Sequence, residues 1–170
     1  MEWTGARYAD CPTAEAGTWI DGSPELVWRF AADVGLMPEL SAELQSVRWC
    51  DGGTGPGLGR SFVGHSKHES FGEWETTSVI VEYDEPRVFG WAVGDPGWPA
   101  AKWRFTLVPE DGGTRLTQCA QLGPGPSGLS YAIERMPDKE QKIVFVRLRE
   151  FEKAMAATVG AIKERAEAAR

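Results

Sequence analysis

The chain contains two histidines, His65 and His68, and both fall in the short segment 65–69. Histidine titrates near neutral pH and is the commonest general acid or base in enzymes. A catalytic histidine also needs a side chain that orients its ring, and the sequence identifies no such partner. We therefore expect His65 to lie at the surface or at the rim of a pocket, with a catalytic base or a ligand anchor as the alternative.

This segment does not favour a metal site. Side chains three residues apart on a β-strand point to opposite faces of the sheet, so His65 and His68 would not face the same ion. The segment also lacks the His-Glu-x-x-His spacing that places two zinc ligands on one helix face. We expect neither a metal nor another cofactor.

Other catalytic motifs are missing from the sequence. The glycine-rich tract 52–59 lacks the Gly-Lys-Ser/Thr of a phosphate-binding loop, and no Gly-x-Ser-x-Gly elbow occurs. Cys50 and Cys119 have no recognisable base partner. Glu73 and Glu75 flank Trp74, and strand alternation predicts that both carboxylates face solvent. Polar residues on the apolar face of the strands are the remaining candidates.

The elements that would position such residues are mostly strands. Turn-forming residues, including the tract 51–59, separate strands predicted at 14–21, 45–50, 60–66, 73–83, 87–94, 101–109 and 114–122. Short turns between consecutive strands predict an antiparallel meander. Alternation places Thr76, Ser78 and Gln118 on the otherwise apolar face. We expect Gln118 either to orient a ligand carbonyl or to bond to the backbone.

Helices are predicted before and after these strands. A long amphipathic helix starts near residue 138, and its apolar residues follow one face of an α-helix: Val144, Leu148, Phe151, Met155, Val159, Ile162 and Ala166. Asp138 and Gln141 have the spacing of a capping box at its start. Two short helices follow the first strand, one capped by Ser23 with Pro24 in its first turn and one ending by Leu44. Another short helix or turn is predicted at 128–136.

Composition narrows the class of protein. The 170 residues fit one domain, 1–170, with its core over 14–168. A net charge of −7 without a basic patch argues against nucleic acid and anionic membrane surfaces as partners. No apolar run reaches the ~18 residues of a membrane span, so we expect no membrane insertion. Three distant cysteines, Cys11, Cys50 and Cys119, predict no disulfide framework. We expect a cytoplasmic monomer or homodimer of the α+β class.

Several local motifs occur in a characteristic order. They are Pro-Glu-x-Val-Trp at 24–28, Gly-Arg-Ser-Phe-Val-Gly at 59–64, Trp-Glu-Thr at 74–76, Phe-Gly-Trp at 89–91, Trp-Arg-Phe at 103–105 and Arg-Met-Pro-Asp at 135–138. With the order of elements, they resemble the START/Bet v 1-like (SRPBCC) superfamily, locally its polyketide cyclase/dehydrase and lipid-transport-like branch. The resemblance covers about residues 14–168 and implies a helix-grip fold, in which a curved antiparallel seven-stranded sheet wraps around the C-terminal helix. His65 departs from the pattern, which has a small amide after Gly64.

The resemblance also implies an internal cavity that binds a hydrophobic small molecule, polyketide-like, aromatic or lipidic. The expected lining is Trp74, Thr76, Trp91, Trp103, Phe105, Gln118, Phe30, Met37, Leu40, Leu148, Phe151 and Met155. An alternative is a cyclase, aromatase or dehydratase that uses the same cavity, with His65 and Gln118 as candidate catalytic residues. A further alternative is a protein-interaction module without a ligand. Arg147, beside the apolar stripe, could pair with a ligand carboxylate, with Glu150 or with Asp138.

Overall fold

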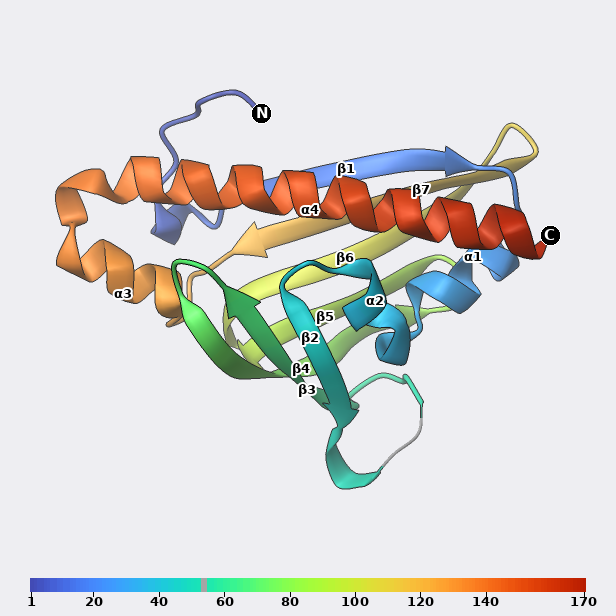
Figure 1. The fold of residues 1–170 in the computed structure, drawn as a ribbon, viewed down its shortest axis with the longest axis horizontal. Coiled ribbons are helices and arrows are strands. Elements are labelled where there is room, and N and C mark those ends of the chain that lie inside the picture. Colours follow the sequence, from blue (N-terminus) through green and yellow to red (C-terminus); the bar gives the residue numbers. More distant parts are fainter. Residues whose placement is uncertain (53–54) are drawn as a thin grey trace.

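The chain folds as a curved sheet that holds a long helix (Figure 1). The structure, a computed structural model, describes residues 1–52 and 55–170, so residues 53 and 54 of the turn expected at 51–59 lie outside it. The strands are β1 (Thr13–Ile20), β2 (Leu44–Trp49), β3 (Ser61–His68), β4 (Gly72–Asp84), β5 (Val88–Asp95), β6 (Trp98–Glu110) and β7 (Gly113–Leu122). The helices are α1 (Pro24–Ala31), α2 (Met37–Leu40), α3 (Gly128–Arg135) and α4 (Glu140–Ala169).

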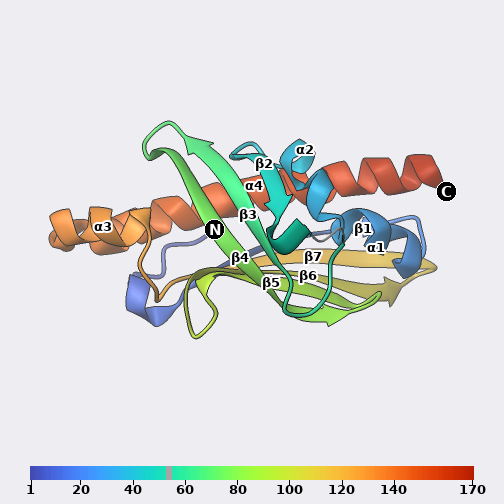
Figure 2. The same ribbon diagram turned by 90° about the horizontal axis from the view of Figure 1, so that it is seen from below.

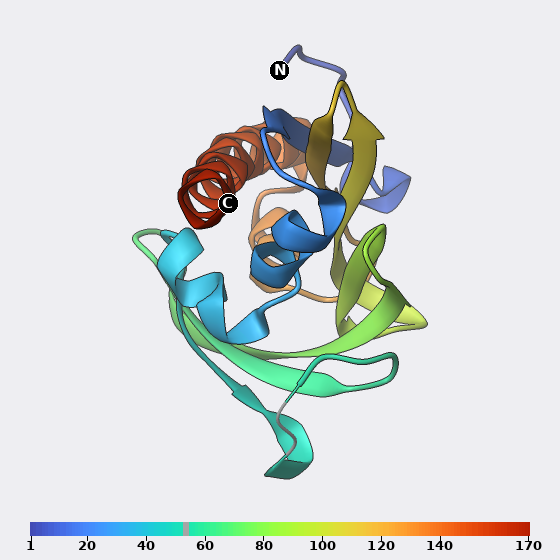
Figure 3. The same cartoon turned by 90° about the vertical axis from the view of Figure 1, so that its right-hand side faces the viewer.

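The seven strands form one antiparallel sheet in the order β1-β7-β6-β5-β4-β3-β2. This order brings the first strand beside the last one, and the sheet curves around the helices as an open half-barrel (Figure 3). The predicted α+β helix-grip fold is therefore confirmed. β3 and β6 are longer than predicted, since β3 continues to His68 and β6 already begins at Trp98.

The register of the sheet confirms which residues share its inner face. Trp91 pairs with Trp103, and Phe105 pairs with Gln118. Because directly paired residues point to the same side of a sheet, the aromatic residues of β5 and β6 and the amide of β7 form one surface. A shift of register between Ile80 and Glu82 in β4 then turns Tyr83 to this side as well, opposite Phe89.

Helix α4 buries the predicted stripe of apolar residues and, in addition, Arg147. Its start differs from the prediction, because a 3₁₀ turn at Pro137–Lys139 precedes it and Asp138 makes no cap. The side chain of Gln141 instead donates to the carbonyl of Gly5 at 2.9 Å. The N-terminal segment thus contacts side chains of the first turn of α4, and Gln141 is engaged there and not in a capping box.

The two short helices bring the chain back over the sheet. Ser23 caps α1 as predicted, since its Oγ accepts a hydrogen bond from the amide of Leu26 at 3.2 Å. Helix α2 is shorter than predicted and ends at Leu40. The Oγ of Ser41 accepts hydrogen bonds from the amides of Glu43 and Leu44 at 3.3 and 3.1 Å, which turns the chain into β2.

The core is solid at one end of α4 and hollow towards the other. The C-terminal half of α4 packs with α1 against the sheet. This cluster of buried residues includes Val159, Ile162, Val27, Phe89 and Leu116. The first turns of α4 extend beyond the end of the sheet, and α3, which precedes α4 in the chain, lies beside them (Figure 2). In the described part of the chain, no helix combines the length and apolarity that a membrane crossing requires.

Candidate functional site

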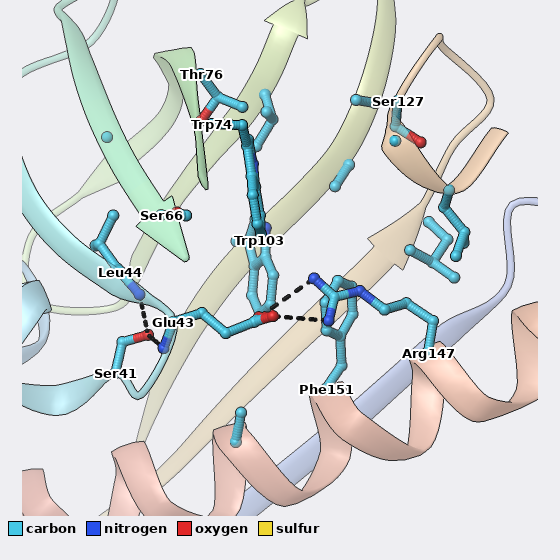
Figure 4. A pocket seen from close by; sticks show the side chains of 18 of the residues that line it. Ser41, Glu43, Leu44, Ser66, Trp74, Thr76, Trp103, Ser127, Arg147 and Phe151 are labelled. Atoms are coloured by element: carbon cyan, nitrogen blue, oxygen red, sulfur yellow. Dashed lines mark hydrogen bonds and ion pairs between the residues drawn. The ribbon is translucent and has the colours of Figure 1, made fainter. Parts of the chain in front are cut away.

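A cavity of about 820 Å³ lies between the inner face of the sheet and α4. Its lining comes from α2 and the start of β2, from strands β3 to β7, and from α3 and α4. Figure 4 shows Trp103 and Phe151 next to each other in the lining, with Thr76 and Ser127 farther along it on either side. A volume of this size is within the range of about 300–1,000 Å³ that pockets for small organic ligands have.

Aromatic rings form the greater part of the hydrophobic wall. Trp91 and Trp103 are stacked, with ring centroids 6.4 Å apart and an interplanar angle of 12°. Trp103 also contacts Phe151 of α4 at a centroid distance of 4.7 Å. Phe71 and Trp74 make an edge-to-face contact at 6.3 Å near the turn between β3 and β4. Rings arranged in this way provide a large, rigid, apolar surface for a ligand.

Most of the residues predicted to line a cavity do line this one. They are Met37, Leu40, Trp74, Thr76, Trp91, Trp103, Phe105, Gln118, Phe151 and Met155. Phe30 and Leu148 do not. Phe30 packs against the solid core near α1, and Leu148 is buried in a separate cluster that includes Ala14, Ala120 and Leu129. Phe30 and Leu148 lie on the apolar faces of their helices, as predicted. Each of these faces extends beyond the part that borders the cavity.

Gln118 is the most deeply buried polar side chain of the cavity lining after Ser78. Only 6% of Gln118 is exposed, and its Oε1 has no hydrogen-bond partner among the described residues. A buried acceptor without a partner destabilises the folded state by about 1–3 kcal/mol. The predicted alternative, a hydrogen bond from the backbone to this oxygen, is therefore absent from the described structure. The oxygen is covered in this structure, and a rotation of the side-chain amide would direct it towards a ligand or a water molecule in the cavity.

His65, the other candidate for catalysis, lies on the outer face of the sheet. It pairs with Glu75 in the register of β3 and β4, and its Nε2 is 3.2 Å from an oxygen of Glu73. Its neighbour Gly64 is the residue that lines the cavity. His65 therefore lies at the surface, which was the main expectation, and the alternative of a catalytic base or ligand anchor in the cavity is wrong, because successive residues of a strand point to opposite faces.

Cys119 also lies on the outer face, one residue from Gln118. It pairs with Arg104 of β6, outside the cavity. Burial, with a smaller contribution from the negative charge of Glu15, raises the pKa of the Cys119 thiol. A raised pKa keeps the sulfur protonated and weakly nucleophilic at neutral pH.

The sequence analysis missed a charged pair at the edge of the cavity. The two terminal nitrogens of Arg147 donate to the two carboxylate oxygens of Glu43 at 2.8 and 3.2 Å (Figure 4). A longer contact of 3.4 Å joins Arg147 to Glu150. The guanidinium also lies 4.6 Å from the ring centre of Phe151 and 5.3 Å from that of Phe71. Arg147 is 8% exposed, so the pair is largely removed from water.

The signal for this pair was the position of Arg147 within the apolar stripe. It lies three residues after Val144 and four before Phe151, on the face that is buried. A buried guanidinium requires an acidic partner, and Glu150 was one of those considered. Glu43 was not, because 104 residues separate it from Arg147.

The cavity opens between α3 and the turn that joins β3 to β4. The lining residues Ser70, Tyr131, Arg135 and Met136 are exposed to solvent, and they lie on the two sides of this opening. Phe71 would be only 3.8 Å from a methyl group built on Gly128, so the start of α3 is close to the opposite side.

A tyrosine from the N-terminal segment fixes the position of α3. The hydroxyl of Tyr8 lies 2.9 Å from the Oγ of Ser127, the residue that caps α3, and donates to the carbonyl of Gly125 at 2.6 Å. Burial raises the pKa of Tyr8, and this effect exceeds the lowering by the hydrogen bond with Ser127. The hydroxyl therefore remains protonated and able to donate at neutral pH.

Solved structures share this fold. A polyketide cyclase-like protein from Corynebacterium glutamicum is 25% identical, with 92% of each chain covered and a TM-score of 0.65. The Zhui aromatase/cyclase of a Streptomyces species is 17% identical, with 93% of this chain and 97% of that one covered and a TM-score of 0.66. Ara h 8.0201 is 17% identical, with 88% and 98% covered and a TM-score of 0.54.

The family comparison extends over almost the whole fold. No curated protein matches the sequence. Residues 13–167 match the family described as polyketide cyclase/dehydrase and lipid transport, a span that runs from β1 to the last turn of α4. It includes every element that lines the cavity. The chain belongs to the polyketide cyclase/dehydrase and lipid transport family.

Proposed function

We propose that the protein binds a hydrophobic small molecule, polyketide-like, aromatic or lipidic, in the cavity between its sheet and α4. The observation that carries this proposal is the aromatic, mostly apolar lining of a space of about 820 Å³ inside an otherwise packed fold. A ligand that buries roughly 300 Å² of apolar surface there would gain about 7 kcal/mol before the entropic costs of binding. The family's description, which includes lipid transport, supports the same function.

The ionisable residues of the lining favour binding over catalysis. In the described structure they are Glu43, Tyr131, Arg135 and Arg147. Glu43 is held by both terminal nitrogens of Arg147, and Tyr131 and Arg135 are exposed at the opening. A general base has to be directed at the reacting proton, whereas both oxygens of Glu43 are held towards Arg147, and a guanidinium cannot act as a base.

The proposal can be tested with two alanines of the same helix. Ala154 lines the cavity, whereas Ala156 is exposed on α4 and lies outside it. Ala154→Phe should fill part of the space and weaken the binding of a hydrophobic fluorescent probe, and Ala156→Phe should not. The titration would follow quenching of tryptophan fluorescence, since Trp91 and Trp103 face the cavity. Equal effects of the two substitutions, or no binding to the wild-type protein, would contradict the proposal.

Native mass spectrometry of freshly purified protein would identify the ligand class directly. A ligand that binds in the cavity should be retained through purification and appear as a fixed mass increment. The increment should be absent from Ala154→Phe and present in Ala156→Phe. Loss of the increment from both variants would show that the retained molecule does not occupy the cavity.

Catalysis in the same cavity is the second candidate, because the family's description also names cyclase and dehydrase activity. An aromatic cavity can hold a flexible chain in a reactive conformation, and Gln118 could assist by a hydrogen bond. Conversion of a linear poly-ketone into a cyclic product by the wild-type protein, and its loss in Gln118→Leu with binding retained, would support this candidate. Unchanged binding without any product would support the binding function alone.

A further inference from the structure

The positive charge at the polar edge of the cavity is already balanced. Arg147 is the cation, and the carboxylates of Glu43 and Glu150 lie 2.8 and 3.4 Å from it. His68 is 2.8 Å from the other oxygen of Glu150 and 3.9 Å from Glu43. One guanidinium therefore faces two carboxylates and one imidazole, so the group carries no surplus positive charge while His68 is neutral.

A ligand carboxylate would have to replace Glu43 to reach Arg147. The contact with Glu43 uses both terminal nitrogens of Arg147, the geometry in which an arginine–carboxylate pair is strongest. The ring of Phe151 lies against the same guanidinium, 4.6 Å from its centre. The other cationic residue of the lining, Arg135, is exposed at the opening, where water and salt screen its charge.

The interior offers acceptors and hydroxyl groups instead of charge. Gln118 lines the cavity opposite Phe105 in the register, and its Oε1 has no partner among the described residues. This oxygen is covered in the structure, so the side-chain amide has to rotate for it to accept a hydrogen bond from a ligand. On the opposite wall, the hydroxyl-bearing residues Thr76 and Ser78 line the cavity from β4. A hydroxyl group on an aromatic ligand can donate to this acceptor while the ring of the ligand packs against the aromatic side chains.

We infer, on the basis of the proposed binding function, that the cavity selects uncharged aromatic ligands that bear a hydroxyl group. Gln118 accepts the hydrogen bond of this hydroxyl, and Trp91, Trp103 and Phe105 contact the ring. Glu43 keeps Arg147 occupied and thereby excludes carboxylates. Gln118 is thus the residue that distinguishes a phenol from a bare ring, and Glu43 is the residue that distinguishes a phenol from an acid.

Three probes of nearly equal size test this selectivity at neutral pH: naphthalene, 2-naphthol and 2-naphthoate. The wild-type protein should bind 2-naphthol about fivefold more tightly than naphthalene, as expected for one additional hydrogen bond. It should bind 2-naphthoate at least about tenfold more weakly than 2-naphthol, because a desolvated carboxylate would meet Glu43. Quenching of tryptophan fluorescence provides the affinities.

Two substitutions should change these preferences in opposite ways. Gln118→Leu should bind naphthalene as well as the wild-type protein and lose its preference for 2-naphthol. Gln121→Leu, on the outer face of the same strand, is the matched control and should keep that preference. Glu43→Gln should release Arg147 and increase the affinity for 2-naphthoate several-fold. Circular dichroism would verify that each variant is folded before binding is measured.

The outcomes separate this inference from the proposed function. If the wild-type protein binds none of the three probes, the binding function itself fails. If it binds 2-naphthoate as tightly as 2-naphthol, or if folded Gln118→Leu still prefers 2-naphthol, binding stands and the selectivity is wrong. If Glu43→Gln leaves the affinity for 2-naphthoate unchanged, Glu43 does not exclude acids.

Discussion

Phe151 and Phe89 provide a direct comparison between a residue that borders the cavity and one in the solid core. Both are buried, with 6% and 0% exposed respectively. Phe89 is surrounded by Trp28, Tyr83 and Trp91 at centroid distances of 5.4 to 6.2 Å, and it does not line the cavity. Phe89→Ala should therefore lower the free energy of unfolding by the usual cost of an emptied aromatic site, about 3–5 kcal/mol.

Phe151→Ala should cost clearly less. One side of the ring already faces empty space, so the substitution enlarges an existing cavity and creates no new one. The contacts that are lost are those with Trp103, worth about 0.5–1.5 kcal/mol, and with Arg147, worth about 0.5–1 kcal/mol. These terms add to the lost transfer free energy of the apolar ring, so Phe151→Ala avoids only the cavity term and should cost about 1–2 kcal/mol less than Phe89→Ala.

Urea denaturation followed by far-ultraviolet circular dichroism measures both values under the same conditions. The dependence of the free energy of unfolding on urea concentration should be equal for the two variants. A difference between their transition midpoints then reflects a difference in stability. Equal losses for Phe151→Ala and Phe89→Ala would refute the reasoning, because they would show that side chains fill the space beside α4. The proposed function and the inference on selectivity would then both lack a binding site.

Three further predictions concern the groups that hold the site in place. Glu43→Gln leaves Arg147 with Glu150 alone and should cost about 1–3 kcal/mol in the same denaturation assay. The double variant with Arg147→Met should lose less than the sum of the single variants. Ser23→Ala removes the cap of α1 and should cost about 1 kcal/mol, whereas Ser23→Asp should remain near the wild type. Burial raises the pKa of Tyr8 above its ordinary 10.0, so the unfolded state loses this proton first and stability should fall as the pH rises above that value. Tyr8→Phe should flatten this decline above about pH 10, measured by urea midpoints.

The inner face of the sheet was predictable because strand alternation is a local property. Trp91, Trp103 and Phe105 follow from a period of two within β5 and β6, and the polar exception Gln118 stands out in the same pattern of β7. His65 was placed less well, because β3 has polar residues on both faces. Because neither face of β3 carries a row of apolar residues, the sequence of this strand does not show which face points inward. The pairing of β3 with β4 determines this.

The limits of the cavity could not be predicted from the same periodicity. Leu148 and Phe151 are three residues apart on α4, and both belong to its buried stripe. Phe151 faces the empty space, whereas Leu148 packs against residues of β1 and β7. A helical period shows which face is buried, but the shape of the opposite surface determines which part of that face borders a void.

The pair of Glu43 and Arg147 depends on three separate elements, and no local pattern indicates it. Among 25 acidic residues, the sequence does not indicate which one reaches a buried arginine. The Oγ of Ser41 sets the turn after α2, the turn directs Glu43 inward, and the stripe of α4 presents Arg147 to it. Stability and selectivity consequently depend on one contact. Substitution of Glu43 should reduce the free energy of unfolding and increase the affinity for carboxylates, and the two effects must appear together if a single charge pair is responsible for both.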